Sequence, residues 1–119
     1  MDYRKETYDF ICFSELAYEW DSSAKKNTET KIRKRLKSIN WEYNQQRIDY
    51  IRSLRNDLFN EISLSDKSKY FTKSNLEYAD LSDFNIKQME TEFKMNYGEI
   101  NNEDLLNIIE FAVYLFYVR

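Results

Sequence analysis

The sequence predicts an all-α protein, a small single-domain bundle of about four to five helices over residues 1–119. Turn-forming residues are nearly absent, with one glycine and no proline in the whole chain. These residues supply the backbone angles of tight hairpin turns, and a fold of many short strands would need them repeatedly. Helices can instead be joined by Asn, Asp and Ser. Apolar side chains that recur every three or four residues give the second indication of helices.

The first helix is expected over residues 3–20, with Asp2 as its N-cap, because apolar side chains follow helical spacing from Phe10 to Trp20. The polar stretch 21–28 is expected to be a loop. Cys12 lies within the apolar stripe, and the lone cysteine permits no intramolecular disulfide. A chain without disulfides favours a reducing, cytoplasmic location.

Residues 28–62 carry the most regular apolar stripe, and Thr28 or Thr30 is the expected cap. The stripe slips out of phase near Gln46 and Arg47, which indicates either one long helix or two shorter ones. A continuous helix would be about 50 Å long and would suggest contacts with a second copy of the chain. We predict one long central basic helix, with the broken helix as the open alternative. The stripe consists of Ile32, Leu36, Ile39, Tyr43, Ile51, Leu54, Leu58 and Ile62.

The next part of the chain is less regular. Residues 63–75 are expected to form a loop, and a minor short strand near 69–81 is left open. Ser82 or Asp83 is expected to cap a helix that ends at Gly98, where a left-handed residue commonly follows a helix.

The last helix is expected to begin at Asn102 and to be stabilised by Glu103 and Asp104 in its first turn. From Leu105 onward it is apolar on nearly every side, which indicates a central core helix or one shared with another subunit. The apolar run of about fourteen residues is shorter than the roughly twenty that span a bilayer, so no membrane role is expected.

The residue types argue against catalysis. The chain has no histidine, which is the usual general base and a common metal ligand. One glycine is too few for a Walker loop or a dinucleotide-binding fingerprint, and no stretch resembles a calcium loop. Buried Cys12 is a poor candidate nucleophile. We therefore expect a protein that is no enzyme and that uses no cofactor and no metal.

Charge is distributed unevenly along the chain. Residues 25–55 hold ten basic and three acidic residues, a local charge of +7, whereas residues 56–119 carry −6. The basic residues are densest over 31–37, where a helix would direct Lys31, Lys34, Arg35 and Lys37 away from its apolar side. Such a face can follow phosphates, meet an acidic protein, or form local ion pairs in solvent.

The acidic half offers the complementary surface. Small acidic inhibitors of nucleases occupy a basic groove, and tyrosines often anchor such interfaces. The candidate contacts in this half are Asp80, Asp83, Glu90 and Tyr97.

Three hypotheses follow from these features. The first is an acidic protein-binding module that neutralises a nuclease or defence complex, like a toxin-immunity protein or a phage-encoded inhibitor of bacterial defence. The second is a nucleic-acid-binding regulator that uses the basic helix 29–55, as a dimer through the apolar stripe. The third is a homo-oligomeric structural protein.

Overall fold

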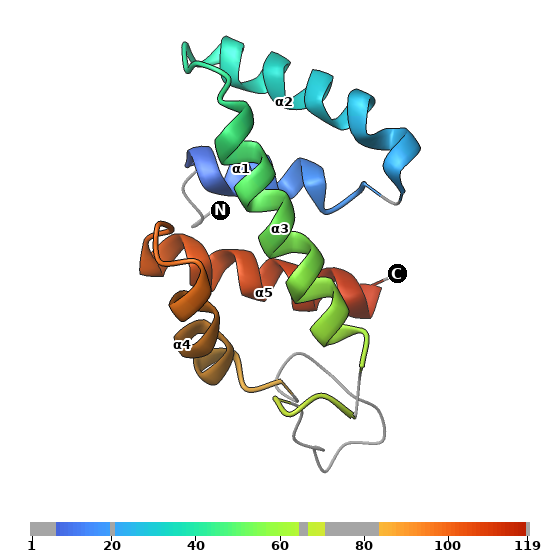
Figure 1. The fold of residues 1–119 in the computed structure, drawn as a ribbon, viewed down its shortest axis with the longest axis vertical. Coiled ribbons are helices and arrows are strands. Elements are labelled where there is room, and N and C mark those ends of the chain that lie inside the picture. Colours follow the sequence, from blue (N-terminus) through green and yellow to red (C-terminus); the bar gives the residue numbers. More distant parts are fainter. Residues whose placement is uncertain (1–6, 20, 65–66, 71–83, 119) are drawn as a thin grey trace. The chain divides into compact units, whose positions relative to one another are not determined.

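The computed structural model describes residues 7–19, 21–64, 67–70 and 84–118. Within these ranges it contains helices and no β-strand, so the all-α prediction is confirmed (Figure 1). Lys69 and Tyr70 form no strand, and the rest of the strand left open near 69–81 lies outside the described residues. The elements are α1 (Tyr8–Leu16), the 3-10 helix η1 (Ser22–Ala24), α2 (Lys25–Ser38), α3 (Gln45–Ile62), α4 (Ile86–Asn96) and α5 (Asn102–Val118).

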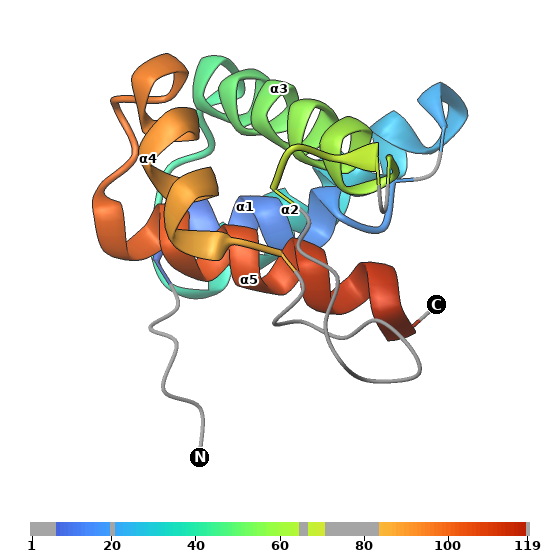
Figure 2. The ribbon, with the colours of Figure 1, turned by 90° about the horizontal axis from the view of Figure 1, so that it is seen from below.

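The chain divides into two compact units, Met1–Arg55 and Asn56–Arg119, and the boundary falls within α3. In the first unit α1 packs against α2, and in the second α4 packs against α5 (Figures 1 and 2). None of the described helices is both long and apolar enough to cross a membrane.

Helix α1 is shorter than the predicted 3–20 helix. The side chain of Thr7 accepts a hydrogen bond from the Phe10 N–H at 3.3 Å, so Thr7 caps the helix. Asp2, the predicted cap, lies outside the described residues, as does Trp20. The helix ends where Ala17 donates its N–H to the carbonyl of Phe13.

Helix α2 begins at Lys25, so the predicted loop over 21–28 was wrong in its second half. Neither Thr28 nor Thr30 caps it. Their hydroxyls donate to the carbonyls of Ala24 and Lys26, one turn earlier, at 3.0 Å in both cases. The chain turns into the helix earlier because Asp21 accepts a hydrogen bond from the Ser23 N–H.

The predicted long basic helix is broken, and the alternative of two helices is correct. Asn40 has a φ of 61°, in the left-handed region. Its N–H bonds to the Lys37 carbonyl, and the Trp41 N–H bonds to the Leu36 carbonyl, the pattern of a Schellman motif. These bonds satisfy the last carbonyls of α2 and terminate it. The side chain of Asn44 then caps α3 by accepting from the Arg47 N–H at 3.1 Å.

Most of the apolar stripe of 28–62 is buried, although Ile39 is 42 % exposed. Ile32, Leu36, Ile51 and Leu54 are each 0 % exposed, so these side chains already belong to the core of the monomer. A dimer through these four side chains would require their exposure to solvent first.

In the second unit, the caps differ from those predicted. The side chain of Asn85 caps α4, whereas Ser82 and Asp83 lie outside the described residues. Gly98 does lie just beyond α4, but its φ is not positive, so the left-handed role predicted for it was wrong. Asn101, one residue before the predicted cap, accepts from the Asp104 N–H at 2.8 Å. The inward side of α5 is buried, as predicted for a core helix, at Leu105, Ile108, Ile109, Ala112, Val113 and Leu115.

The α2 core gives a direct test of this packing. Leu36→Ala is expected to lower the free energy of unfolding by about 3 kcal/mol, because it leaves a cavity at a fully buried position. Ile39→Ala, at the end of the same helix but 42 % exposed, is the matched control and is expected to change it by less than about 0.5 kcal/mol. Urea unfolding followed by circular dichroism measures both. Equal effects of the two substitutions would contradict the burial of Leu36.

Candidate nucleic-acid interface

Arginines in the first unit are paired with acids of the same unit. Arg35 lies 3.0 Å from the carboxylate of Glu15, and Arg47 lies 2.7 Å from that of Asp9. Arg55 donates to the backbone carbonyl of residue 19. These guanidinium groups therefore help to hold the unit together.

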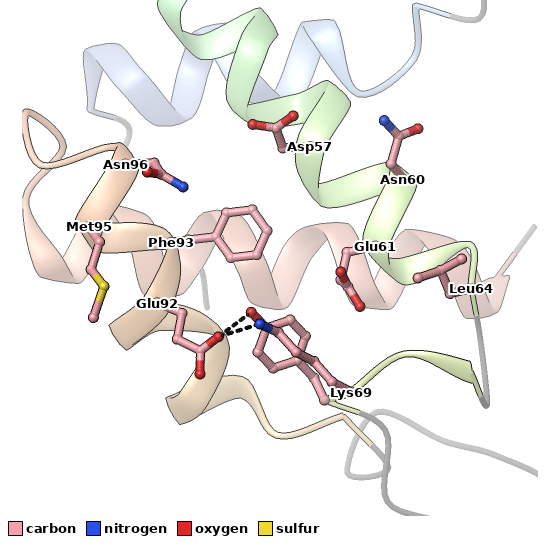
Figure 3. Close-up of a pocket in the computed structure, with 10 residues that line it drawn as sticks. Asp57, Asn60, Glu61, Leu64, Lys69, Glu92, Phe93, Met95 and Asn96 are labelled. Carbon is pink, nitrogen blue, oxygen red and sulfur yellow. Dashed lines mark hydrogen bonds and ion pairs between the residues drawn. The ribbon is translucent and has the colours of Figure 1, made fainter.

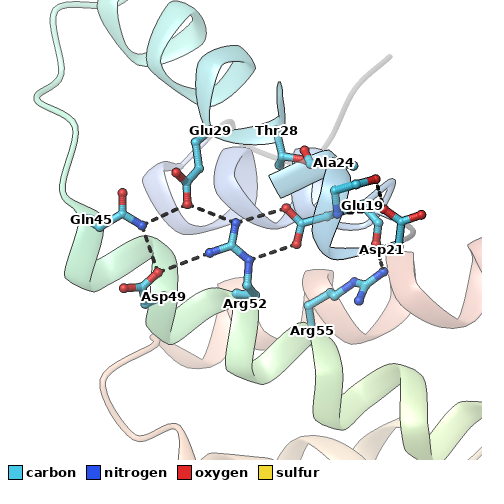
Figure 4. A network of polar contacts seen from close by, with 10 residues as sticks. Glu19, Asp21, Ala24, Thr28, Glu29, Gln45, Asp49, Arg52 and Arg55 are labelled. Carbon is cyan, nitrogen blue, oxygen red and sulfur yellow. Dashed lines mark hydrogen bonds and ion pairs between the residues drawn. The ribbon is translucent and has the colours of Figure 1, made fainter. Parts of the chain in front are cut away.

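Arg52 is the centre of the largest of these polar networks (Figure 4). Its guanidinium lies 2.9 Å from Glu19, 3.2 Å from Glu29 and 3.2 Å from Asp49. Gln45 donates to both Glu29 and Asp49, which closes the ring of contacts. The Arg52 side chain is only 13 % exposed, so this network is partly shielded from solvent.

Burial and charge act in opposite directions on this network. Burial disfavours the charged form of both Glu19 and Arg52. The attraction between the two groups is stronger: the hydrogen bond and charge of Arg52 lower the pKa of Glu19, and Glu19 with Glu29 raises the pKa of Arg52. Both groups are therefore charged at neutral pH.

Once these arginines are set aside, the exposed cations among residues 7–19 and 21–55 lie on α2. The helix turns Thr28, Ile32 and Leu36 inward. Five exposed cations lie within roughly 160° of arc on the opposite side. We call them the α2 cationic face: Lys26, Lys31, Arg33, Lys34 and Lys37.

The α2 cationic face is not offset by acids of its own helix. Glu29 is the acid in α2, and it lies on the flank that meets Arg52. Lys31, Lys34 and Lys37 are exposed as predicted, whereas Arg35 is half-buried and also donates to the Ser14 hydroxyl at 2.8 Å. Arg35 is thus placed among the structural arginines, apart from the three lysines.

A shallow hollow of about 550 Å³ lies at the C-terminal end of the cationic face, and we call it the α2 hollow. Trp41, at its rim, is 40 % exposed. The guanidinium of Arg33 lies 3.7 Å from the centre of the Tyr43 ring, a cation–π contact. The hollow is lined by Arg33, Lys34, Lys37, Asn40, Trp41, Glu42 and Tyr43.

Of the residues predicted for an acidic interface, the structure describes Glu90 and Tyr97. Asp80 and Asp83 lie outside the described residues. Glu90 is half-buried on α4. Tyr97 is 5 % exposed, and its hydroxyl donates to Asp57, so it supports the fold at this position rather than projecting as an anchor.

The second unit nevertheless contains an acidic groove that the sequence did not indicate (Figure 3). It has a volume of about 560 Å³, and its carboxylates come from Asp57, Glu61 and Glu92. Met95, on its rim, is 79 % exposed. In the sequence, the i, i+4 spacing of Asp57 and Glu61 places two acids on one side of a helix. The spacing does not show that α4 supplies the other side of the groove.

Glu92 is firmly ionised in this groove. The Tyr70 hydroxyl donates to it at 2.7 Å, the Lys69 ammonium lies 2.9 Å away, and Gln88 donates at 3.0 Å. Together these contacts lower the pKa of Glu92 to about 2. Glu92 is therefore ionised at neutral pH, where it is paired with the Lys69 ammonium.

Cys12 does not have the properties of a nucleophile. Burial, followed by the nearby charge of Asp9, raises the pKa of its thiol to about 12. Among the described residues, no cluster of three or more acid or cysteine side chains is arranged to hold a metal ion.

Comparison of the chain with protein-family models, curated proteins and solved structures finds no match.

The Arg52 network predicts a stability defect that depends on pH. Arg52→Met is expected to cost about 3 kcal/mol at pH 7, because it leaves the buried carboxylate of Glu19 without its counter-charge. The lowered pKa of Glu19 stabilises the native protein above about pH 4.3, the ordinary glutamate value, and this stabilisation is lost as pH falls through the folded value. The difference between variant and parent should therefore shrink in acid.

Urea unfolding at pH 7 and in acid measures this difference. Lys26→Met, which removes an exposed cation of α2, is the control and is expected to have an effect below about 0.5 kcal/mol. A loss for Arg52→Met that stays constant across this pH range would assign the defect to packing instead of charge.

Proposed function

We propose that this protein is a binding module, without catalytic activity, that engages nucleic acid through the α2 cationic face. The observation that carries the proposal is the separation of charges in the first unit. Ion pairs with Arg35, Arg47 and Arg52 occupy five acids of this unit, while the cations of the outer α2 surface remain exposed. The five acids are Asp9, Glu15, Glu19, Glu29 and Asp49. Exposed cations on one helix face are suited to repeated phosphate contacts.

The dimensions of the face agree with this use. From Lys26 to Lys37 the helix rises by roughly 16 Å, comparable to about five steps along a nucleic-acid strand. Lysine ammonium groups on flexible stems are compatible with contacts to a backbone whose sequence is not read. The net charge of −3 means that other surfaces repel a polyanion, which restricts binding to this face.

Charge reversal on the cationic face tests the proposal. Lys34→Glu with Lys37→Glu is expected to weaken binding to a labelled oligonucleotide by at least about tenfold and to reduce its dependence on salt. The matched control is Lys67→Glu with Lys87→Glu, which makes the same change in net charge at exposed positions of the second unit. Fluorescence polarisation between about 50 and 200 mM salt measures both. Equal loss in the two double variants, or no loss in the first, would overturn the proposal. Arg35 is unsuitable here because its substitution would also break the contact with Glu15.

The acidic groove supports a second candidate function, that of a module which neutralises a nucleic-acid-handling protein. A groove with ionised Glu92 and an exposed methionine offers charge and an adaptable apolar contact to a basic partner. In this candidate the groove would occupy the partner's nucleic-acid site, as a stoichiometric inhibitor of a nuclease or defence complex.

Inhibition assays test the second candidate. The purified protein is expected to reduce nuclease activity to a plateau at one equivalent, with an association rate that falls as salt rises. Met95→Ala, which truncates the exposed methionine that lines the groove, should weaken the inhibition by about tenfold. Tyr114→Ala, which truncates an aromatic residue 46 % exposed on α5, is the control. Unchanged nuclease activity over a broad panel would remove this candidate.

A further inference from the structure

We propose that the α2 hollow stacks an unpaired nucleobase on Trp41, and that the preferred ligand is therefore single-stranded nucleic acid. This inference rests on the proposed nucleic-acid binding and assigns its ligand class. The supporting observation is that the exposed indole of Trp41 lies in the same hollow as the cations at the C-terminal end of α2.

Trp41 is held by a neighbouring ring. Its indole and the ring of Tyr8 lie with centroids 6.0 Å apart and planes inclined by 28°, a stacked arrangement. The Tyr8 hydroxyl donates to the Glu42 carbonyl at 2.7 Å and accepts from the Asn44 N–H at 2.8 Å. Tyr8 is thereby fixed to the loop that carries Trp41. A ring that is already positioned loses little conformational freedom when a base stacks on it.

The backbone places this ring at the end of the cationic face. Asn40 adopts its left-handed conformation directly after α2, and the Trp41 N–H bonds to the Leu36 carbonyl at 2.9 Å. Trp41 lies four residues after Lys37 in the sequence, just beyond α2, and both residues line the same hollow.

The two aromatic residues of the hollow have different roles. The face of Tyr43 is covered by Arg33 at 3.7 Å, so this ring already has a cationic partner. Trp41 keeps 40 % of its surface exposed, although Tyr8 lies against it. The indole is thus the surface on which a base can stack.

Cations and an acid set the orientation of the ligand. Lys34 and Lys37 line the hollow and can bind phosphates on either side of the stacked base. Glu42 lines the hollow as well, and its carboxylate repels phosphate while it can accept a hydrogen bond from an N–H group on the edge of a base. The volume of about 550 Å³ lies within the range of small-molecule sites.

This arrangement discriminates single strands from duplexes. Bases in a duplex are paired and stacked on their neighbours, so they cannot reach an indole in a surface hollow without being extruded at an energetic cost. Unpaired bases stack on aromatic side chains without strong sequence preference, because every base has a π-face.

The experiment uses the full chain and two labelled probes, an oligothymidylate and a hairpin duplex of equal charge. The chain has two tryptophans, so Trp20→Phe leaves Trp41 as the only indole reporter. We expect the single strand to bind more tightly than the duplex and to quench the Trp41 emission. Trp41→Ala should weaken single-strand binding by about tenfold while the salt dependence and duplex affinity stay unchanged, because stacking and phosphate contacts are separate contributions.

Two further variants control the measurement. Tyr18→Ala truncates another aromatic residue of the first unit, 55 % exposed and not among those lining the hollow, and should leave binding unchanged. Trp41→Phe retains an aromatic face and should keep most of the affinity, which separates stacking from a folding defect in the alanine variant.

The outcomes distinguish this inference from the proposal beneath it. Stacking is overturned if the two probes bind with equal affinity and Trp41→Ala binds as tightly as the parent protein. Phosphate binding is still supported in that case if the Lys34→Glu, Lys37→Glu variant no longer binds either probe. Binding to neither probe overturns both. Loss of single-strand binding in Trp41→Ala together with retention in Trp41→Phe and Tyr18→Ala supports the stacked base.

Discussion

The guanidinium of Arg52 joins three carboxylates from different parts of the first unit, and the character of the α2 surface depends on this contact. One of the three, Glu29, is the acid of α2 itself. Because Glu29 is paired on the flank of the helix, it does not neutralise the lysines of the outer face. Without this network, the basic helix would be a mixed surface with weaker attraction for a polyanion.

The break after α2 has an equally direct consequence for the surface. A continuous helix over 28–62 would distribute the cations and aromatic residues along a rod. The left-handed conformation of Asn40 ends α2 and places Trp41 and Tyr43 in a hollow with Arg33 and Lys37. A local backbone conformation therefore creates the concave surface on which the stacking inference is built.

The sequence predicted the helical class because spacing such as that of Ile32 and Leu36 depends only on local periodicity. It did not locate the helix break, since the left-handed turn falls on an asparagine and no glycine marks it. The sequence also predicted the basic character of 31–37. It could not separate Arg35 from the lysines, because the partner Glu15 lies 20 residues away and only tertiary packing brings them together. Trp41 was missed although it lies only four residues beyond Lys37, because its neighbour Tyr8 belongs to another helix.

The two units handle their acids in different ways, and this explains how a net charge of −3 conceals surfaces of opposite sign. In the first unit, arginines offer paired N–H donors to carboxylates and cancel their charge. In the groove of the second unit, the hydroxyl groups of Ser68 and Tyr97 donate to Glu61 and Asp57 without cancelling their charge, whereas Glu92 is also paired with Lys69. Hydrogen bonds from neutral donors leave Asp57 and Glu61 charged, whereas ion pairs in the first unit cancel acids such as Glu29 and leave the α2 lysines exposed. In the first unit arginines pair with acids and the α2 lysines stay exposed, so the lysines determine which face is available to an anionic ligand.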